Sequence, residues 1–343
     1  MTTNTPKRAR RASMADVAKL AGVSAQTVSR VSNGHAGVVE ETRQQVLDAM
    51  KQLGYRPNGA ARALKWGEFR TIGVIMFTLS TTGNMRTLDA ISVAAAEEGY
   101  AITLIPVAVP TPGGVEGAFS RLGELAVDAV IIVMEVHLLG RSHIALPPGI
   151  PVVVVDSDAG SEYVVVDTDQ ATGARSAVDH LLGLGHRTVW HVAGPEDSFA
   201  SQRRVDAWQG ALADAGRDAP PLIRGDWSAE SGYRAGLLLA DEPGCTAVFA
   251  ANDQMALGIL RALRERGRDV PGDVSVVGFD DVPDAGSYSP PLTTVHQDFT
   301  QVGRRCVDGV LRQVRSDDGA PEPGTTLVPT TLVVRSSTAP PRT

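Results

Sequence analysis

Short apolar runs alternate with amphipathic stretches from Thr71 almost to the end of the chain. Runs typical of buried strands occupy residues 72–77, 102–107, 130–134, 152–155, 164–166, 189–192, 247–250 and 274–279, and helical periodicity marks residues 84–98, 172–184, 205–215 and 253–266. This alternation predicts β-α-β units and a mainly parallel sheet. So many units indicate two sheets, because single cores stop growing at about 250–300 residues.

The first 57 residues have helical periodicity and no strand-like run. A helix is predicted to begin at Ser13, which forms an S-x-x-D capping box with Asp16, and to end at Gly22. Ser24 is the predicted cap of a second helix. The inward positions of these two helices are Val17, Ala18, Leu20, Ala21, Val28 and Val31, and the outward positions of the second are Ala25, Gln26, Ser29 and Arg30. The spacing is that of a helix-turn-helix.

A third helix is predicted from about Glu40 to Leu53, with Gly54 as its stop. Its inner side is predicted to carry Val46, Leu47, Met50 and Leu53. Three short helices then enclose a small core of their own.

Charge separates this head from the rest of the chain. The whole chain has a net charge of −7, but residues 1–66 contain eleven Lys and Arg against four Asp and Glu, a balance of +7, which leaves −14 for the remainder. A basic head on an acidic body predicts that the head binds a polyanion and the body binds something else.

The segment ADVAKLAGVSAQTVSRVSNG, followed by TRQQVLDAMKQLGYRPNGAARAL, resembles the head and hinge of the lactose-repressor (LacI) family. The resemblance implies that Gln26 and Arg30 read base edges in the major groove, with Ala25 and Ser29 as smaller contacts. It also implies that Thr27, Asn33 and the basic arm contact phosphates, which position the head.

The same resemblance makes residues 58–68 a hinge that folds on DNA and inserts Leu64 into the minor groove, where an apolar wedge bends the duplex. Without the flanking motif, Leu64 would be interpreted as an ordinary linker residue. Gly59 departs from the family pattern, and glycine weakens a helix by about 1 kcal/mol relative to alanine.

Polar side chains follow several predicted strands of the body, where open parallel sheets usually bind ligands. Asp156, Asn252, Asp280 and Gln297 have such places, Arg204 lies in a helix, and Trp227 lies in a turn. Together they suit a polyol, because carboxylates, amides and arginine bond hydroxyls and an indole covers a sugar ring. Each residue alone can also be explained by a structural role, since aspartates after strands commonly cap helices and tryptophans commonly fill cores.

The segments AGPEDSFASQRRVDAW, GDWSAESGY, FAANDQMALG, SVVGFDD and SYSPPLTTVHQDF resemble the body of the same family, so the match covers about residues 13–335. The resemblance implies an effector cleft lined by Asp156, Arg204, Trp227, Asn252, Asp280, Gln297 and Phe299. Two positions depart: Phe77 and Val133 stand where the lactose-repressor pattern has a serine and an asparagine. A galactoside is therefore one candidate effector, and a glycoside with an apolar aglycone is another.

We therefore expect an α/β protein: a three-helix helix-turn-helix head and a two-lobed, periplasmic-binding-protein-like (type I) core of doubly wound parallel sheets. The expected segments are a basic arm at 1–12, the DNA-binding domain at 13–57, the hinge at 58–68 and the ligand-binding and dimerisation core at 69–343. The first lobe is expected at about 70–163 and 296–325, and the second at about 164–292 and 326–338.

The leading interpretation is a cytoplasmic repressor of pseudo-palindromic DNA operators, controlled by a sugar effector. The resemblance implies a homodimer, and the ending SSTAPPRT, which has no heptad segment, predicts a dimer rather than a tetramer. A periplasmic-type sugar-binding protein would share the body, but it needs an export signal, whose apolar core Asp16 and Lys19 would interrupt. It would also have no use for residues 13–65.

A wound α/β enzyme is the third class, and it would need a nucleophile or cofactor loop. No phosphate-binding GxxxxGK[ST] loop and no HExxH motif occur, and the adjacent Asp280 and Asp281 are poor candidates for an acid/base pair. Cys245 and Cys306 lack the spacing of a zinc site or a disulfide framework. No apolar run approaches the roughly 20 residues of a membrane span. We expect neither catalysis, nor a metal, nor a cofactor.

Overall fold

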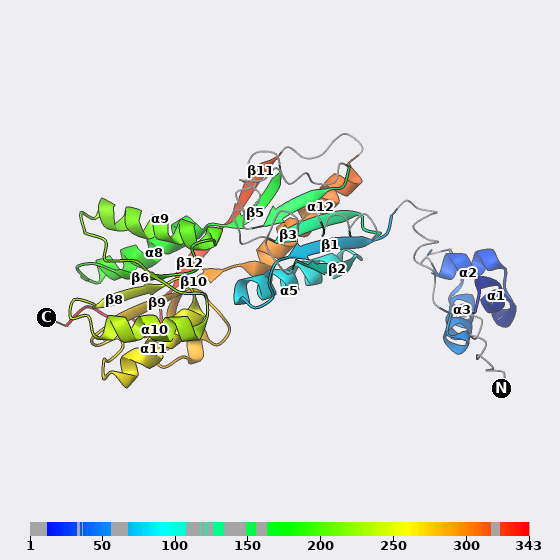
Figure 1. Cartoon of the computed structure of the whole chain (residues 1–343). Coiled ribbons are helices and arrows are strands. Elements are labelled where there is room, and N and C mark those ends of the chain that lie inside the picture. Colours follow the sequence, from blue (N-terminus) through cyan, green and yellow to red (C-terminus); the bar gives the residue numbers. More distant parts are fainter. Residues whose placement is uncertain are drawn as a thin grey trace, which may run out of the picture. The chain divides into compact units, whose positions relative to one another are not determined.

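The structure is a computed structural model, and it describes residues 12–32, 35, 37–55, 68–107, 117, 121, 126–133, 149–155, 163–316 and 323–342. The chain divides into two compact units, Met1–Phe69 and Arg70–Thr343 (Figure 1). We call them the head and the body and describe each by itself.

The head contains the three predicted helices, α1 (Met14–Ala21), α2 (Ala25–Ser32) and α3 (Glu40–Leu53). The capping box of α1 is confirmed, since the Ser13 amide donates to Asp16 Oδ2 over 2.8 Å and the Asp16 amide donates to Ser13 Oγ. Gly22 ends α1 with a φ of 67°, a left-handed conformation that glycine adopts without strain. The amide of Thr27 donates to Ser24 Oγ, so Ser24 caps α2 as predicted.

The core of the head is smaller than the sequence pattern predicted. It consists of Val17, Ala18, Val28, Val31, Val46, Ala49 and Met50. Three predicted inner residues, Leu20, Leu47 and Leu53, are exposed by 46%, 44% and 36% of their surface. A bundle of three short helices encloses one narrow stripe of each helix, and these leucines lie beside or beyond that stripe.

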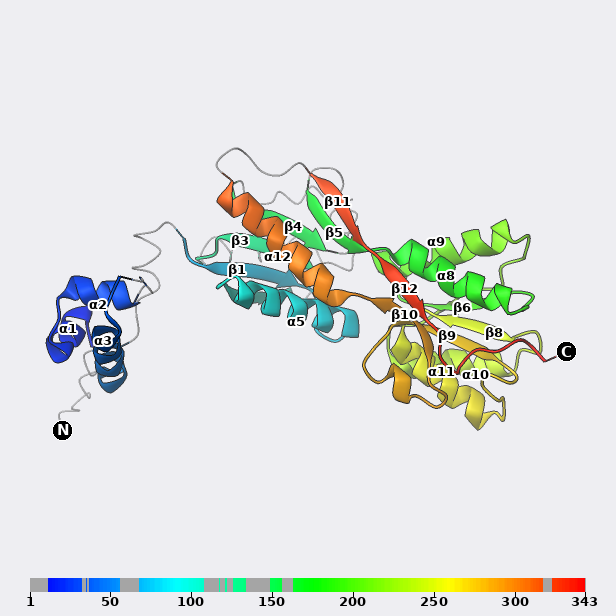
Figure 2. The same ribbon diagram turned by 180° about the vertical axis from the view of Figure 1, so that it is seen from behind.

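The first lobe of the body is built on a six-stranded parallel sheet with the order β11-β5-β4-β3-β1-β2. Its elements are β1 (Thr71–Met76), α5 (Thr82–Glu97), β2 (Ala101–Pro106), β3 (Ala129–Val133), β4 (Val152–Val155), β5 (Val164–Thr168), α12 (Phe299–Arg315) and β11 (Gly324–Val328). Helices α5 and α12 lie side by side over one face of this sheet (Figure 2).

The second lobe has another six-stranded sheet, with the order β12-β10-β9-β8-β6-β7. Its strands are β6 (Trp190–Ala193), β7 (Ile223–Arg224), β8 (Ala247–Ala250), β9 (Ser275–Asp280), β10 (Thr293–Gln297) and β12 (Thr330–Val333), of which β12 alone is antiparallel. Helices α8 (Gln170–Gly183) and α9 (Phe199–Asp214) cover one face, and α10 (Ala229–Ala240) and α11 (Asp253–Glu265) cover the other (Figure 1). A 3-10 turn spans Ala285–Ser287.

Three lobe boundaries differ from the predicted ones. Strand β5 (Val164–Thr168) pairs with β4 in the first lobe, β10 continues to Gln297 in the second lobe, and β11 continues to Val328 in the first. The chain therefore crosses between lobes at Asp169, Asp298 and Pro329. Sheet membership depends on pairing between distant segments, so the local sequence pattern cannot set it.

Two of these crossing residues act alike. Asp169 and Asp298 have nearly the same backbone conformation (φ −72° and −83°, both with ψ 77°), and each side chain accepts a hydrogen bond from the first turn of the helix that follows. These caps fix the first turns of α8 and α12 at the boundary between the lobes. The polar ends of β5 and β10, which precede the caps, are thereby held at the interlobe pocket described next.

Candidate functional site

A pocket that opens to solvent lies between the lobes at the carboxyl ends of strands from both sheets. Its residues from the first lobe include Thr81, Asn84, Val133, Val155, Asp167, Thr168 and Phe299, and those from the second include Gln170, Arg204, Trp227, Asn252, Asp280 and Gln297. This is the position at which open parallel sheets bind ligands.

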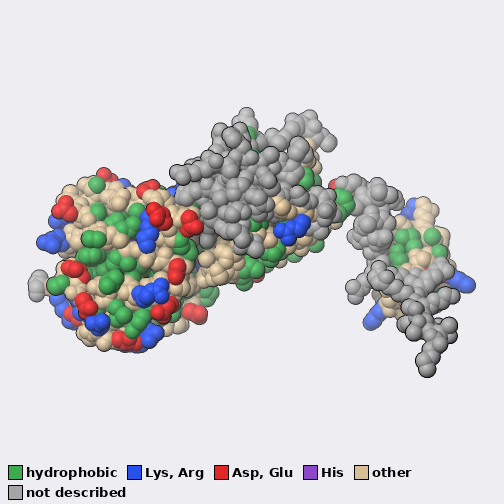
Figure 3. All heavy atoms as spheres, viewed as in Figure 1, with side chains coloured by type: hydrophobic (Ala, Val, Ile, Leu, Met, Phe, Trp, Pro, Cys, Tyr) green, Lys and Arg blue, Asp and Glu red, His purple; other side chains and the backbone are tan. Residues whose placement is uncertain are grey.

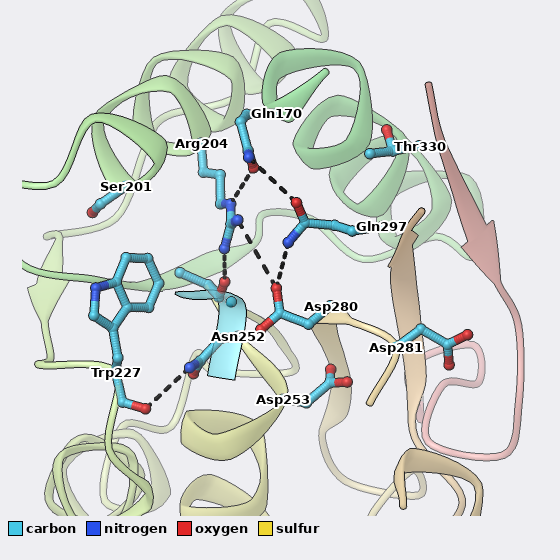
Figure 4. Close-up of polar contacts among 12 residues, drawn as sticks. Gln170, Ser201, Arg204, Trp227, Asn252, Asp253, Asp280, Asp281, Gln297 and Thr330 are labelled. Carbon is cyan, nitrogen blue, oxygen red and sulfur yellow. Dashed lines mark hydrogen bonds and ion pairs between the residues drawn. The ribbon is translucent and has the colours of Figure 1, made fainter. Parts of the chain in front are cut away.

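A polar network anchored by Arg204 forms the second-lobe side of the pocket (Figure 4). Arg204 Nε donates to Gln170 Oε1 over 2.8 Å, and its Nη1 donates to the carbonyl of Ala251. Gln297 Nε2 donates to Asp280 Oδ1 over 2.6 Å, and Gln170 Nε2 donates to Gln297 Oε1 over 3.4 Å. The four polar side chains thus hold one another in fixed orientations.

Asp280 ends β9, and its carboxylate lies 4.0 Å from the Arg204 guanidinium. Burial raises the pKa of Asp280 to about 6, although Arg204 and the hydrogen bond from Gln297 favour the ionised form. Arg204 also stacks 3.7 Å above the ring of Phe279. The two charges compensate each other, so this part of the pocket presents hydrogen-bonding groups without a net charge.

Trp227 supplies an aromatic surface beside this network. It follows β7 in a turn and has a φ of 70°, and the Arg204 guanidinium lies 5.5 Å from its ring centre. The ring packs on Gly194, where a Cβ atom would lie 2.3 Å from the indole. Its carbonyl accepts a hydrogen bond from Asn252 Nδ2 over 3.0 Å, and Asn252 Oδ1 caps α11. Glycine at 194 therefore leaves the room in which the indole lies.

Arg86 of the first lobe bridges to the second lobe at the edge of the pocket. Its Nη1 donates to the carbonyls of Asp280 and Asp281 over 3.1 and 3.4 Å, and its guanidinium stacks 4.5 Å above the ring of Phe299. Asp280 and Asp281 have φ values of 113° and 49°, which are costly for residues other than glycine. The contacts of Arg86 help to hold this strained turn.

Asp281 and Asp253 lie beside the network but have other partners. Asp281 pairs with Arg335 over 2.7 Å, and its Oδ2 lies 3.0 Å from His296 Nδ1, so it does not share a proton site with Asp280. Asp253 accepts hydrogen bonds from the Val282 amide and the Thr294 hydroxyl. Burial and the neighbouring Asp280 raise the pKa of Asp253 to about 8. Both aspartates are therefore held by contacts within the second lobe, which is a structural role.

The structure brings together six of the seven residues predicted to line the cleft, namely Arg204, Trp227, Asn252, Asp280, Gln297 and Phe299. The seventh, Asp156, lies outside the described residues. Val133, which stands where the lactose-repressor pattern has an asparagine, lines the pocket. Phe77 instead packs against the apolar cluster of Ile75, Val130 and Ile132.

Sequence reasoning missed polar residues of the first lobe. Because Phe77 and Val133 replace a serine and an asparagine of the family pattern, the sequence predicts fewer hydrogen-bonding groups in the first lobe. Asn84, Asp167 and Thr168 nevertheless line the pocket from that lobe. Asp167 could have been found, because it follows the apolar run 164–166 as Asp280 follows its own run. Gln170 opens a helix, and nothing local indicates that it meets Arg204.

The candidate DNA-binding residues lie on α2. Ala25, Gln26 and Arg30 are exposed, while Thr27 and Ser29 are partly buried. The predicted contacts Asn33 and Leu64 lie outside the described residues, as does Gly59. Lys and Arg side chains are visible on the head in Figure 3, whereas the second lobe carries both signs of charge. No other part of the described head covers these exposed residues of α2, so the helix can enter a DNA groove.

Within the described ranges, no cluster of three or more His, Cys, Asp or Glu residues could hold a metal ion. In the same part of the chain, no helix has the length and apolar character that crossing a membrane requires. His186 bonds Thr246 and Ser275, and His191 is stacked on Phe249 in the interior. These contacts give both histidines a role in packing the second lobe.

Comparison with known proteins agrees with both units. Residues 13–58 match the bacterial regulatory proteins of the lacI family, and residues 178–338 match a periplasmic binding protein-like domain. The chain is 34% identical over 333 residues to the lactose operon repressor of Escherichia coli (strain K12), covering 96% of this chain and 91% of that protein. It is 31% identical to the HTH-type transcriptional repressor PurR of Haemophilus influenzae (strain PittEE), covering 95% and 98%.

Solved structures give the same result. A lac repressor dimer bound to operator and the anti-inducer ONPF has a TM-score of 0.85 and 33% identity, covering 96% of this chain and all of that one. The complex of the transcriptional regulator CelR with cellobiose has a TM-score of 0.71 and 31% identity, covering 95% of this chain and all of that one.

A helix-turn-helix head joined to a two-lobed body with an interlobe pocket defines a ligand-responsive DNA-binding regulator. The chain belongs to the lacI family and is a DNA-binding transcriptional repressor. The predicted fold class is confirmed by these matches, and the prediction that the protein is not an enzyme is confirmed by relatives that are themselves transcriptional repressors.

Proposed function

We propose that the effector of this repressor is a sugar or glycoside that binds between the two lobes and controls the affinity for the operator. The observation that carries the proposal is the charge-compensated network of Arg204, Asp280, Gln297 and Gln170 beside the Trp227 ring. Fixed donors and acceptors without net charge match neutral hydroxyl groups, and an indole face matches the apolar side of a sugar ring.

The relatives are compatible with this class of ligand. The CelR structure contains cellobiose, and the lac repressor structures contain ONPF or ONPG. The first-lobe side of the pocket differs, since Val133 is apolar while Asn84, Asp167 and Thr168 are polar. A galactoside is one candidate, and other glycosides compete with it on equal terms.

In the head, we assign base reading to Gln26 and Arg30. Both are exposed on α2, and they can form bidentate hydrogen bonds with adenine and guanine edges. Ala25 and Ser29 are assigned smaller groove contacts. Thr27 and Asn33 are assigned phosphate contacts, and Leu64 is assigned the minor-groove wedge.

We propose that the repressor is a cytoplasmic homodimer, because each head reads one half of a pseudo-palindromic operator and the chromosome lies in that compartment. The ligand then favours one lobe arrangement, which changes the fit of the two heads to the operator. Ligand and operator affinities must be coupled reciprocally, typically by about 1–3 kcal/mol.

The experiment is a thermal-shift screen with galactose, glucose, lactose, cellobiose and, as a competing planar ligand, hypoxanthine. A sugar that binds the folded protein raises its melting temperature, and the rise grows with concentration. We expect a shift with at least one sugar in wild type and none in Arg204→Ala. A shift with hypoxanthine and with no sugar would overturn the proposed effector class.

A further inference from the structure

Asp167 ends strand β5 on the first-lobe side of the pocket, and only 1% of its side chain is exposed. Its Oδ2 accepts a hydrogen bond of 2.8 Å from Nη1 of Arg203, which belongs to α9 of the second lobe. Its Oδ1 is buried and has no donor at full hydrogen-bond geometry among the described residues, although the backbone amide of Thr168 lies close enough to the carboxylate to favour its ionised form. One half of this carboxylate is therefore used across the lobe boundary, while the other half lacks a fully formed hydrogen bond.

A buried acceptor without a donor is unfavourable, and native proteins rarely retain one unless a water, an ion or a ligand supplies the missing bond. Asp167 lines the same pocket as Arg204 and Asp280. A ligand in this pocket would lie beside Asp167 and could supply the missing donor.

We propose that Asp167 is a further specificity-determining residue, which accepts a hydrogen bond from a hydroxyl of the bound sugar. The inference rests on the proposed sugar effector and extends it to the first lobe. Asp280, from the second-lobe sheet, lines the same pocket. The ligand therefore offers hydroxyl donors to a carboxylate of each lobe.

Arg203 is a positioning residue in this scheme. Its guanidinium stacks 4.2 Å above the ring of Phe199 and pairs with Asp167 from the opposite lobe. The ion pair occupies Oδ2 of Asp167 and leaves Oδ1 for the ligand. The pair can form only while the two lobes are as close as they are here, so ligand recognition by Asp167 also depends on the lobe arrangement.

The wild type is compared with Asp167→Ala, the near-isosteric Asp167→Asn and Arg203→Gln. The matched control is Asp179→Asn, which makes the same chemical change at an exposed position of α8. Binding is measured by calorimetry with galactose, glucose, lactose and cellobiose and with the monodeoxy forms of galactose and glucose. Circular dichroism verifies that each variant is folded.

We expect Asp167→Ala to weaken binding of the best parent sugar by about 10- to 100-fold, the usual effect of losing a buried hydrogen bond to a charged group. One monodeoxy sugar should bind the wild type more weakly by a similar factor and should lose little more in Asp167→Ala. Arg203→Gln should weaken all sugars by a smaller, common factor, because glutamine can still donate to Oδ2. Asp179→Asn should bind as the wild type does.

Unchanged sugar affinity in both folded Asp167 variants would overturn this inference and leave the proposed function standing. An equal loss for every deoxy sugar would also overturn it, because no single hydroxyl would then depend on Asp167. If no sugar binds the wild type, the proposed function fails, and this inference fails with it.

Discussion

The guanidinium of Arg204 and the carboxylate of Asp280 lie 4.0 Å apart between the lobes, and neither side chain is more than 6% exposed. Each ion is costly to bury alone and tolerable beside the other. The interlobe pocket is thus built on a pair whose members depend on one another, and we expect both the stability of the protein and the proposed ligand response to depend on this pair.

Replacing Arg204 with Ala should lower the free energy of unfolding by about 3 kcal/mol, because Asp280 loses its cation inside the protein. Urea denaturation measures this loss. The double variant Arg204→Ala, Asp280→Asn should recover part of it, since no uncompensated charge then remains. Equal losses in the single and double variants would show that the pair is not coupled.

The same Arg204→Ala substitution should leave ligand-free operator binding intact and abolish the response to sugar. Arg204 belongs to the body, and the proposed operator contacts belong to the head. Fluorescence anisotropy with a labelled operator, with and without sugar, measures both properties. A sugar response equal to that of the wild type would show that the site has been assigned wrongly.

Asp253 should make the stability of the protein depend on pH near neutrality. Its native pKa of about 8 lies above the ordinary value of 3.8, so the folded protein keeps a proton that the unfolded chain releases, and stability falls as pH rises from 6 to 8. Its share of this fall is about 2 kcal/mol.

Asp253→Asn should lack this share. Asparagine can accept from the Val282 amide with its oxygen and donate to the Thr294 hydroxyl with its nitrogen, so both contacts survive. Urea denaturation at pH 6, 7 and 8 compares the variant with the wild type. Identical pH profiles for the two proteins would refute the raised pKa.

Gly258 should be intolerant of any side chain. A Cβ atom there would lie 1.9 Å from the carbonyl oxygen of Ala229, because α10 and α11 touch at this point. Gly258→Ala should destabilise the body by about 1–3 kcal/mol or more through overpacking. Gly244→Ala is the control, since its Cβ would meet nothing within 4 Å. Equal stability of both variants, measured by thermal denaturation, would contradict this packing.

Gln26 should contribute to sequence preference more than to general DNA affinity. Replacing it with Ala should reduce discrimination at one base pair of each half-site by about 1–3 kcal/mol. Competition binding with single-base operator variants measures this, and Gln52→Ala, at an exposed position of α3, is the control. An unchanged preference at every operator position in Gln26→Ala would remove Gln26 from the base-reading residues.

Local patterns predicted most of the fold. The capping box at Ser13, the left-handed stop at Gly22 and the third helix from Glu40 to Leu53 follow from interactions within a few residues, and they occur as expected. The central strands β3 and β4 of the first lobe and β8 and β9 of the second follow from apolar runs that are buried on both sides. The partly exposed strands β7, β11 and β12 have no such run. Leu47 was misplaced because a three-helix core buries less of each helix than the apolar pattern offers.

The site was predictable where a polar residue ends or directly follows a strand, even for Gln297, whose lobe was assigned wrongly. Asp280, Asn252 and Gln297 meet this condition, and they line the pocket. Asp167 also follows a strand, but the pairing of β5 with β4, which puts it in the first lobe, is a contact between distant segments. The bond between Arg204 and Gln170 joins two helices of the second lobe, and no local pattern indicates it.

The central claim is that one protein both recognises a nucleotide sequence and senses a sugar. Its most direct test is operator binding measured by anisotropy on the DNA upstream of the protein's own gene and on a scrambled duplex of equal length, at fixed salt, with and without the best sugar from the thermal-shift screen. We expect tighter binding to the natural sequence than to the scrambled duplex. Adding sugar should shift the operator affinity of the wild type by about 5- to 150-fold and should leave that of Arg204→Ala unchanged. Equal affinity for both duplexes, or an operator affinity that no binding sugar changes, would contradict it.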